Sequence, residues 1–238
     1  MVLYYNRDCG ILIDCNNFAL VLLCKLVVTD GDIVPVNVMR RGYLFMDYSE
    51  VIEFVKKTAS ENGRPNLYPF RNSYEHTMRV YRWAIRLQTK LGGDLDVIVL
   101  AALLHDVDDH KLFITENNMN ARTFLQSQNI ESDVVEFICE VINGVSFSKN
   151  RGKQPESIEG KIVQDADRLD AIGAIGIARA FAFGGKKGRS LESSLQHFNE
   201  KLLLLKDEMN TDEAKKIAEV RHIYMQGFLA EIREEMES

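Results

Sequence analysis

The sequence predicts an all-α protein with a short β-like extension at its N-terminus. From Met46 onward, apolar residues recur at helical spacing almost throughout the chain. The first 45 residues instead hold β-branched and aliphatic runs bounded by Asp-Gly and Asn-Asn pairs, which is typical of strands. Hydrophobic residues make up 46% and charged residues 27% of the 238 positions, which is ordinary for a globular protein and excludes collagen-like and Pro/Gly-rich disordered classes.

The charge balance argues against a nucleic-acid polymer as a partner. Lys and Arg total 29 while Asp and Glu total 35, so the formal net charge is −6 and there is no global basic field for a phosphate backbone. No apolar run approaches the roughly 18–20 residues of a membrane span, so no membrane partner is expected. The four cysteines show no C-x-x-C spacing, which indicates reduced thiols in a cytoplasmic protein. The pattern is silent on oligomeric state.

The strand-like runs are Gly10–Ile13 and Leu20–Val28. An extension with two or three strands cannot bury a core alone, so it must pack on the helices, pair with another chain or be disordered. We therefore divide the chain into an extension, residues 1–45, and a helical domain, residues 46–238. An alternative is that residues 1–45 are an over-called start. Arg40-Arg41-Gly42 can be encoded by AGG-AGG-GG, which would act as a ribosome-binding sequence upstream of Met46.

The helices are predicted from their caps and from their apolar faces. Asp94 is expected to begin a helix that is apolar nearly all round, and such a helix is central and buried. In chain order we expect a helix from Asp47 to about Thr58 with a capping-box-like Glu50, one from Asn72 or Ser73 to about Leu91, the one capped by Asp94, one from Ser132, one from about Ile158 to Ala182, and a last one capped by Thr211.

Ionisable residues stand at the end of the buried helix and on two of its neighbours. His105-Asp106 follows the apolar run directly, and an unpaired buried carboxylate must meet a cation, a hydrogen-bond donor or water. A divalent metal held by this pair is one explanation, and an acidic helix end that emerges into solvent is the other. His76 lies in the first turn of an amphipathic helix, where a structural or exposed histidine is also common.

Three aspartates interrupt another apolar helix. Asp167 and Asp170 are three residues apart and share a face, whereas Asp165 points roughly the other way. Asp165 and Arg168 have the spacing of an i,i+3 ion pair, which would give Asp165 a structural role and leave Asp167 to face inward.

Taken together, His76, the His105-Asp106 doublet and Asp167 resemble the H…HD…D pattern of the HD-domain superfamily of metal-dependent phosphohydrolases. The resemblance covers about residues 46–238. The blocks at 165–181, 184–189, 197–202 and 206–211 look like a bacterial branch of small soluble nucleotide phosphohydrolases and pyrophosphohydrolases. The resemblance implies an HD-type helical bundle.

It also implies one divalent metal ion held by those four residues. Two imidazoles and two carboxylates suit Mn, Fe, Co or Ni ions, with Zn or Mg as alternatives. Asp109 lies four residues after His105 and shares its face if the helix continues, and a carboxylate at this offset is assigned acid/base work in related enzymes. We expect Asp109 to orient or deprotonate the attacking water.

A phosphate-bearing substrate also needs cations. Lys111 is close to the doublet, Lys149 follows Ser146-Phe147-Ser148, and Lys186 belongs to a Gly-rich segment with Lys187 and Arg189 that we expect to be a loop. Solvated surface charge is the alternative for each of these residues. The expected function is hydrolysis of a phosphoester or phosphoanhydride bond in a small phosphorylated metabolite, with a nucleotide favoured. The rivals are hydrolysis of a cyclic or alarmone nucleotide and a metal- or nucleotide-sensing module without turnover.

Overall fold

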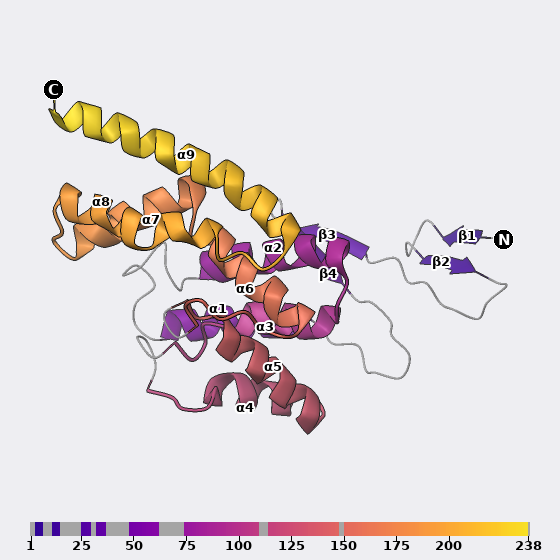
Figure 1. Ribbon diagram of the computed structural model, residues 1–238. Coiled ribbons are helices and arrows are strands. Elements are labelled where there is room, and N and C mark those ends of the chain that lie inside the picture. The colour runs from indigo at the N-terminus through magenta and orange to yellow at the C-terminus, as the bar shows by residue number, and fades with distance from the viewer. Residues whose placement is uncertain are drawn as a thin grey trace. The chain divides into compact units, whose positions relative to one another are not determined.

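The computed structural model describes most of the chain and is helical over most of its length (Figure 1). The described residues are 3–6, 11–14, 25–29, 32–36, 48–61, 74–109, 114–147 and 150–237. The helices are α1 Tyr48–Glu61, α2 Tyr74–Leu91, α3 Leu95–Leu104, α4 Met119–Ser127, α5 Ser132–Val145, α6 Ile158–Asp170, α7 Gly173–Lys186, α8 Leu191–Glu200, the 3₁₀ helix η1 Leu202–Lys206, and α9 Asp212–Glu237. The predicted all-α class with a β-like extension is therefore confirmed.

The N-terminal strands form two antiparallel hairpins. Strand β1 (Leu3–Asn6) pairs with β2 (Ile11–Asp14), and β3 (Lys25–Thr29) pairs with β4 (Asp32–Val36). The chain separates into two compact units, residues 1–53 and 54–238. The boundary at residue 46 and the alternative start there fall outside the described residues and stay predictions.

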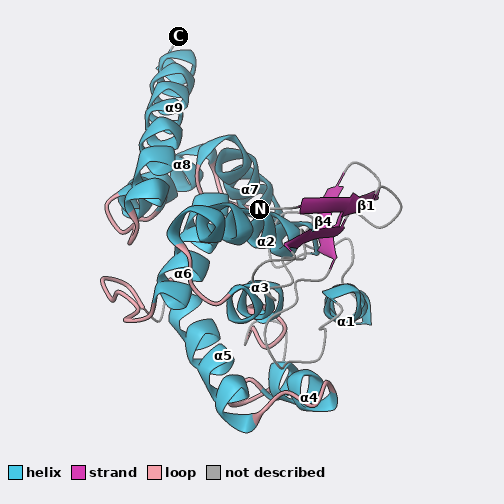
Figure 2. Ribbon diagram, turned by 90° about the vertical axis from the view of Figure 1, so that its right-hand side faces the viewer, coloured by secondary structure: helices cyan, strands magenta, loops and turns pink. Residues whose placement is uncertain are grey.

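Helix α3 is the centre of the second unit. Every residue from Val97 to Leu104 is at most 5% exposed, as the uniformly apolar run predicts. The helix begins where predicted, because the Asp94 carboxylate accepts hydrogen bonds from the backbone N–H groups of Asp96 and Val97. Helices α2, α5 and α6 pack against it, and Figure 2 shows α3 nearly end-on between them.

The predicted single helix from Ile158 to Ala182 is wrong. Helix α6 ends at Asp170, and α7 begins at Gly173. Gly173 has a φ of +79°, a left-handed conformation that glycine adopts without the steric cost of a Cβ. Because the chain turns at Gly173, α7 runs in a different direction from α6. Side chains of both helices, Asp167 and Arg179 among them, line one cavity.

The start of α9 is tied to α6 by a buried carboxylate. Asp165 is fully buried, and its two oxygens accept four hydrogen bonds of 2.8–2.9 Å from the backbone N–H groups and side chains of Asn210 and Thr211. Thr211 in turn caps α9 by accepting from the Ala214 N–H, as predicted. Arg168 does not form the expected pair with Asp165. It donates instead to the backbone oxygen of Glu208, whose carboxylate lies 3.3 Å from its Nη2.

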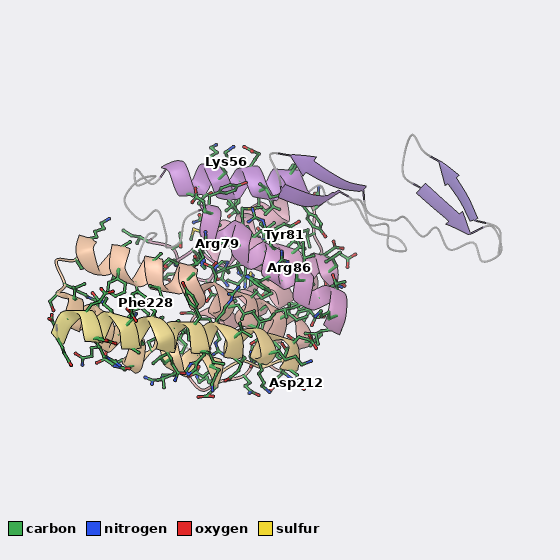
Figure 3. All side chains as sticks on the ribbon, turned by 90° about the horizontal axis from the view of Figure 1, so that it is seen from above. Lys56, Arg79, Tyr81, Arg86, Asp212 and Phe228 are labelled. Atoms are coloured by element: carbon green, nitrogen blue, oxygen red, sulfur yellow. The ribbon has the colours of Figure 1, made fainter. Side chains whose placement is uncertain are left out.

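Aromatic packing joins the three C-terminal helices. The Phe181 ring lies 5.7 Å from that of Phe198 on α8 and 5.7 Å from that of Phe228 on α9, which is labelled in Figure 3. This cluster holds α8 and α9 against α7. Among the helices that the structure describes, none has both the length and the apolar character that crossing a bilayer requires.

Candidate metal centre

The four residues of the predicted metal site come together from three helices. His76 lies in the first turn of α2, His105 and Asp106 directly follow the last residue of α3, and Asp167 lies near the end of α6. The Nε2 atoms of the two histidines are 3.4 Å apart. Oδ2 of Asp106 lies 3.5 Å from Nε2 of His76 and 3.4 Å from Nε2 of His105. Oδ1 of Asp167 lies 3.3 and 4.0 Å from the same two nitrogens.

These spacings are those of atoms that share one metal ion. Ligand atoms at about 2.1 Å from a metal lie about 3.0 Å apart in an octahedron and about 3.4 Å apart in a tetrahedron. Among the described residues, His76, His105 and Asp167 form a group whose ligand atoms all lie within 4.8 Å of one another. Asp106 adds an oxygen next to both histidines.

Each imidazole makes a hydrogen bond through Nδ1, so that its Nε2 lone pair faces the cluster. Nδ1 of His76 donates to Oδ2 of Asp170 at 2.7 Å, and Nδ1 of His105 donates to the backbone oxygen of Ala102 at 2.8 Å. A neutral histidine whose Nδ1 carries the proton has an acceptor at Nε2. Within the described part of the chain, Oδ2 of Asp106 is buried and accepts no hydrogen bond. Four electron-rich atoms therefore face one another, and this donor set fits a divalent cation.

The electrostatics of the protein alone point the same way. Burial lowers the pKa of His105, but the carboxylates of Asp106 and Asp167 and the hydrogen bond to Ala102 outweigh it and raise that pKa to about 9. Burial likewise raises the pKa of Asp106, and the positive fields of His105, His76 and Arg179 more than offset it, so that pKa falls well below its usual range. The carboxylates are thus held ionised and favour a positive charge beside them, which a proton on His105 supplies in the metal-free protein and a divalent cation would supply in its place.

A second layer of residues orients His76. The Asp170 carboxylate, which is 2% exposed, accepts hydrogen bonds from Nε and Nη2 of Arg79 at 2.6 and 3.1 Å, and a further one from Arg179. Such carboxylate–histidine contacts fix the tautomer of a metal-binding imidazole. The sequence indicated only that Asp170 shares a face with Asp167. It gave Arg79 and Arg179 no role, although Arg79 lies three residues after His76 on the same helix.

The segment after α3 is a turn and not the helical continuation that would carry Asp109 onto the face of His105. Helix α3 ends at Leu104, and the Asp109 N–H bonds the backbone oxygen of Asp106 at 3.2 Å. Asp108 anchors the turn, since its two oxygens accept from the backbone N–H groups of Asn120 and Ala121 at the start of α4, each at 3.0 Å. Asp109 nevertheless lines the same cavity as the cluster.

That cavity has a volume of about 410 Å³, within the range of small-molecule sites. All four cluster residues line it, and so do three cationic side chains, Arg179, Arg189 and Lys201. A cavity that is lined by carboxylates, imidazoles and cations suits a ligand that is itself anionic and can meet a metal.

Of the three lysines predicted to bind substrate, the structure describes one. Lys111 and Lys149 lie outside the described residues, and both stay predictions. Lys186 is exposed in the last turn of α7 and is not among the residues that line the cavity. The first part of the Gly-rich segment, residues 184–186, is the end of helix α7 and not the expected loop. Arg189, three residues further, lines the cavity.

Comparison with known proteins gives a consistent family. A family model described as HD domain matches residues 73–172. The protein YpgQ of Bacillus subtilis is 41% identical over 174 residues, which cover 69% of this chain and 84% of YpgQ. The crystal structure of YpgQ in complex with ADP superposes with a TM-score of 0.66 at 34% identity, over 79% of this chain and 93% of that one. An HD-superfamily hydrolase from Bacillus thuringiensis superposes with a TM-score of 0.65 at 40% identity, over 80% and 96%.

Proposed function

Because the chain belongs to the HD-domain superfamily of hydrolases, we propose that it is a metal-dependent phosphohydrolase of a small phosphorylated metabolite, with a nucleotide as the favoured substrate. The observation that carries the proposal is that the two imidazole Nε2 atoms lie 3.4 Å apart, with carboxylate oxygens of Asp106 and Asp167 at 3.3–4.0 Å from them, on the wall of a cavity that cations also line. The structure of YpgQ with ADP supports a nucleotide as the ligand class.

In this proposal His76, His105, Asp106 and Asp167 hold one divalent cation, for which Mn, Fe, Co or Ni suits the donor set best and Zn or Mg is an alternative. The bound cation supplies Lewis acidity toward a phosphoryl oxygen and lowers the pKa of a water molecule. Asp170 keeps the proton of His76 on Nδ1, so that Nε2 stays available as a ligand.

Proton handling falls to Asp109. Its carboxylate lines the cavity, and its backbone is held by the bond to Asp106 within a turn that Asp108 fixes to α4. A carboxylate in this position can accept a proton from the attacking water and orient it toward phosphorus. A module that only senses a nucleotide has no need of such a group, which favours turnover over sensing.

The test is a screen for phosphate release by purified protein with Mn²⁺ from nucleoside mono-, di- and triphosphates, each with and without added inorganic pyrophosphatase. Release from a monophosphate identifies a phosphomonoesterase. Release from a triphosphate that requires pyrophosphatase identifies a pyrophosphohydrolase. The His105→Ala variant should be inactive, and His222→Ala, a histidine on α9 that does not line the cavity, should match the wild type. Absence of release from every nucleotide, with Mn²⁺ shown to be bound, would overturn the nucleotide as substrate and point to a non-nucleotide metabolite or to the sensing module.

A further inference from the structure

Helix α9 has an apolar stripe on the side that faces away from the core. Its core-facing side holds four residues that are at most 2% exposed: Ala214, Ala218, Met225 and Leu229. Val220, Ile223 and Tyr224 point away from that side and are 70%, 60% and 58% exposed. Their spacing of i, i+3 and i+4 makes them neighbours on one face, the α9 stripe. Figure 1 shows α9 at the edge of the helical unit, with α7 and α8 on one side of it.

A glycine continues the α9 stripe and has no packing role within one copy of the chain. Gly227 lies three residues after Tyr224 and four after Ile223, so it belongs to the same face. A Cβ placed on Gly227 would meet no other part of the protein within 4 Å. Glycine inside a helix is less stable than alanine, so its presence here has a cost without a benefit inside the monomer. The missing side chain leaves a notch in the stripe, which a side chain from a second helix can fill.

The N-terminal end of the α9 stripe carries positive charge. Lys216 lies one turn before the stripe, and 70% of its side chain is exposed. It bonds the carboxylate of Glu213, which also accepts a hydrogen bond from Lys90 on α2. Two lysines thus share one carboxylate, and this end keeps an excess positive charge at the surface.

The C-terminal end of the stripe carries negative charge. Glu231 lies one turn after Gly227, and Glu234 lies one turn further along the same face, both exposed. Within the described residues neither carboxylate forms an ion pair, and the last turn of α9 has no basic residue. Acidic groups near a helix C-terminus face the negative end of the helix dipole, which is unfavourable. A helix that runs in the opposite direction would bring positive charge to this end.

A second copy of α9 in antiparallel orientation matches the apolar part of this pattern. With a twofold axis between positions 223 and 224, Ile223 of each copy lies opposite Tyr224 of the other. The same register sets Val220 of each copy opposite the notch at Gly227. A twofold interface makes each of these contacts twice, which is how one self-complementary surface is used in most homodimers.

The same register also pairs the charges. Lys216 of each copy lies opposite Glu231 of the other, at both ends of a contact that is about 22 Å long at the helical rise per residue. A parallel pairing would instead set like charges side by side at each end. From these observations we propose that α9 is a self-association surface, through which two copies of this chain form an antiparallel twofold dimer. One helix from each copy makes a small interface, so the dimer is reversible and concentration-dependent. The inference does not depend on the proposed hydrolysis.

Sedimentation equilibrium of the full-length protein over a wide concentration range tests the dimer. The average mass of the wild type should rise from 27.2 kDa toward twice that value as concentration increases. Ile223→Glu sets two carboxylates beside the twofold axis and should raise the dissociation constant at least about a hundredfold, because like charges across an interface repel. Met119→Glu is the matched control, since Met119 is 55% exposed on α4, at the opposite end of the helical unit from α9 (Figure 1, Figure 2). It should leave the dissociation constant unchanged.

Charge reversal tests the antiparallel register. Lys216→Glu and Glu231→Lys should each raise the dissociation constant about tenfold, because two attractive pairs become repulsive. The double variant restores opposite charges at both ends and should return to within about threefold of the wild type. Lys215→Glu is the control: Lys215 also forms an exposed i,i+3 pair, with Asp212, but it points to another side of α9. This change should alter the dissociation constant less than about twofold, as screened surface charges do.

Three results would overturn the proposal. A mass of 27.2 kDa at every concentration would leave the stripe to another part of the chain or to a different protein. A dimer that persists in Ile223→Glu would be formed through another surface. A double variant no tighter than Lys216→Glu alone would rule out the antiparallel register. Circular dichroism melts verify that each variant is folded, and phosphate release is measured separately, so loss of the hydrolase assignment would leave this inference standing.

Discussion

Helix α6 presents two neighbouring carboxylates to very different surroundings. Asp165 is fully buried, and both of its oxygens are occupied by backbone and side-chain donors of Asn210 and Thr211. Asp167, on the opposite face, keeps 23% of its side chain exposed and meets the imidazoles of His76 and His105 at the cavity. One carboxylate completes the junction between α6 and α9, and the other is left with capacity for a ligand.

The comparison shows that burial of a carboxylate does not by itself indicate a catalytic or metal-binding role. Burial raises the pKa of Asp165 in spite of its four hydrogen bonds, whereas for Asp167 burial acts in the same sense but the histidines outweigh it and the pKa falls. The two residues differ in their partners. Neutral N–H and O–H groups surround Asp165 and give it a structural role, whereas titratable imidazoles that can bind a metal lie beside Asp167 and indicate a functional one.

The largest expected effect is on the functional face. Asp167→Asn should lower Mn²⁺-dependent phosphate release by about a thousandfold or more, because an amide oxygen carries no charge for the metal and its NH₂ group repels it. Mn²⁺ affinity, measured by calorimetry, should fall in parallel. Full activity in this variant would contradict the assignment of Asp167 as a metal ligand.

The same substitution on the other face should reverse the pattern. Asp165→Asn replaces one acceptor oxygen by a donor that faces N–H or O–H groups, so two buried donors lose their partner, at a cost of about 3 kcal/mol in the free energy of unfolding. Mn²⁺ affinity of the folded fraction should stay at the wild-type level. Urea denaturation gives the first quantity, and calorimetry below the unfolding transition gives the second. A loss of metal affinity as large as that of Asp167→Asn would erase the distinction between the faces.

Asp170 tests whether the functional face extends beyond the ligands. Asp170→Asn should weaken Mn²⁺ binding by about 10- to 100-fold, because His76 loses the carboxylate that holds its proton on Nδ1. The effect should be smaller than that of Asp167→Asn, since no metal ligand is removed. Arg86→Gln is the control and should leave Mn²⁺ affinity unchanged. Arg86 is on the same helix as His76 and Arg79, but its guanidinium lies over Trp83 and not at Asp170. An Asp170→Asn variant with wild-type affinity would make the Asp170 network purely structural.

Features that depend on nearby residues were predictable from the sequence, and those that depend on the direction of the chain were not. The caps at Asp94 and Thr211 and the burial of α3 follow from local spacing and an unbroken apolar run, and all three are found. The break at Gly173 was missed because a glycine also occurs inside helices, and nothing local says that its φ will be positive. Once that turn is misjudged, the meeting of Arg179 with Asp170 cannot be foreseen.

The cations show the same limit on a smaller scale. Lys186 and Arg189 lie three residues apart, yet only Arg189 lines the cavity, because the turn closed by its bond to Gly184 directs it there. Spacing along the sequence predicts such a choice only where the helix is known to continue.

The smallest expected effect lies at the α6–α9 junction. Thr211→Val keeps the shape of the side chain but removes the hydroxyl that donates to Asp165 and accepts from the Ala214 N–H. Loss of this cap should cost about 1 kcal/mol in the free energy of unfolding, less than Asp165→Asn because the backbone N–H of residue 211 still reaches the carboxylate. Urea denaturation measures it, with Thr89→Val, an exposed hydroxyl on α2, as the control. Because Thr211 contacts only the structural face, Mn²⁺ affinity and phosphate release should stay at wild-type values, and a change in either would mean that the two faces of α6 are coupled.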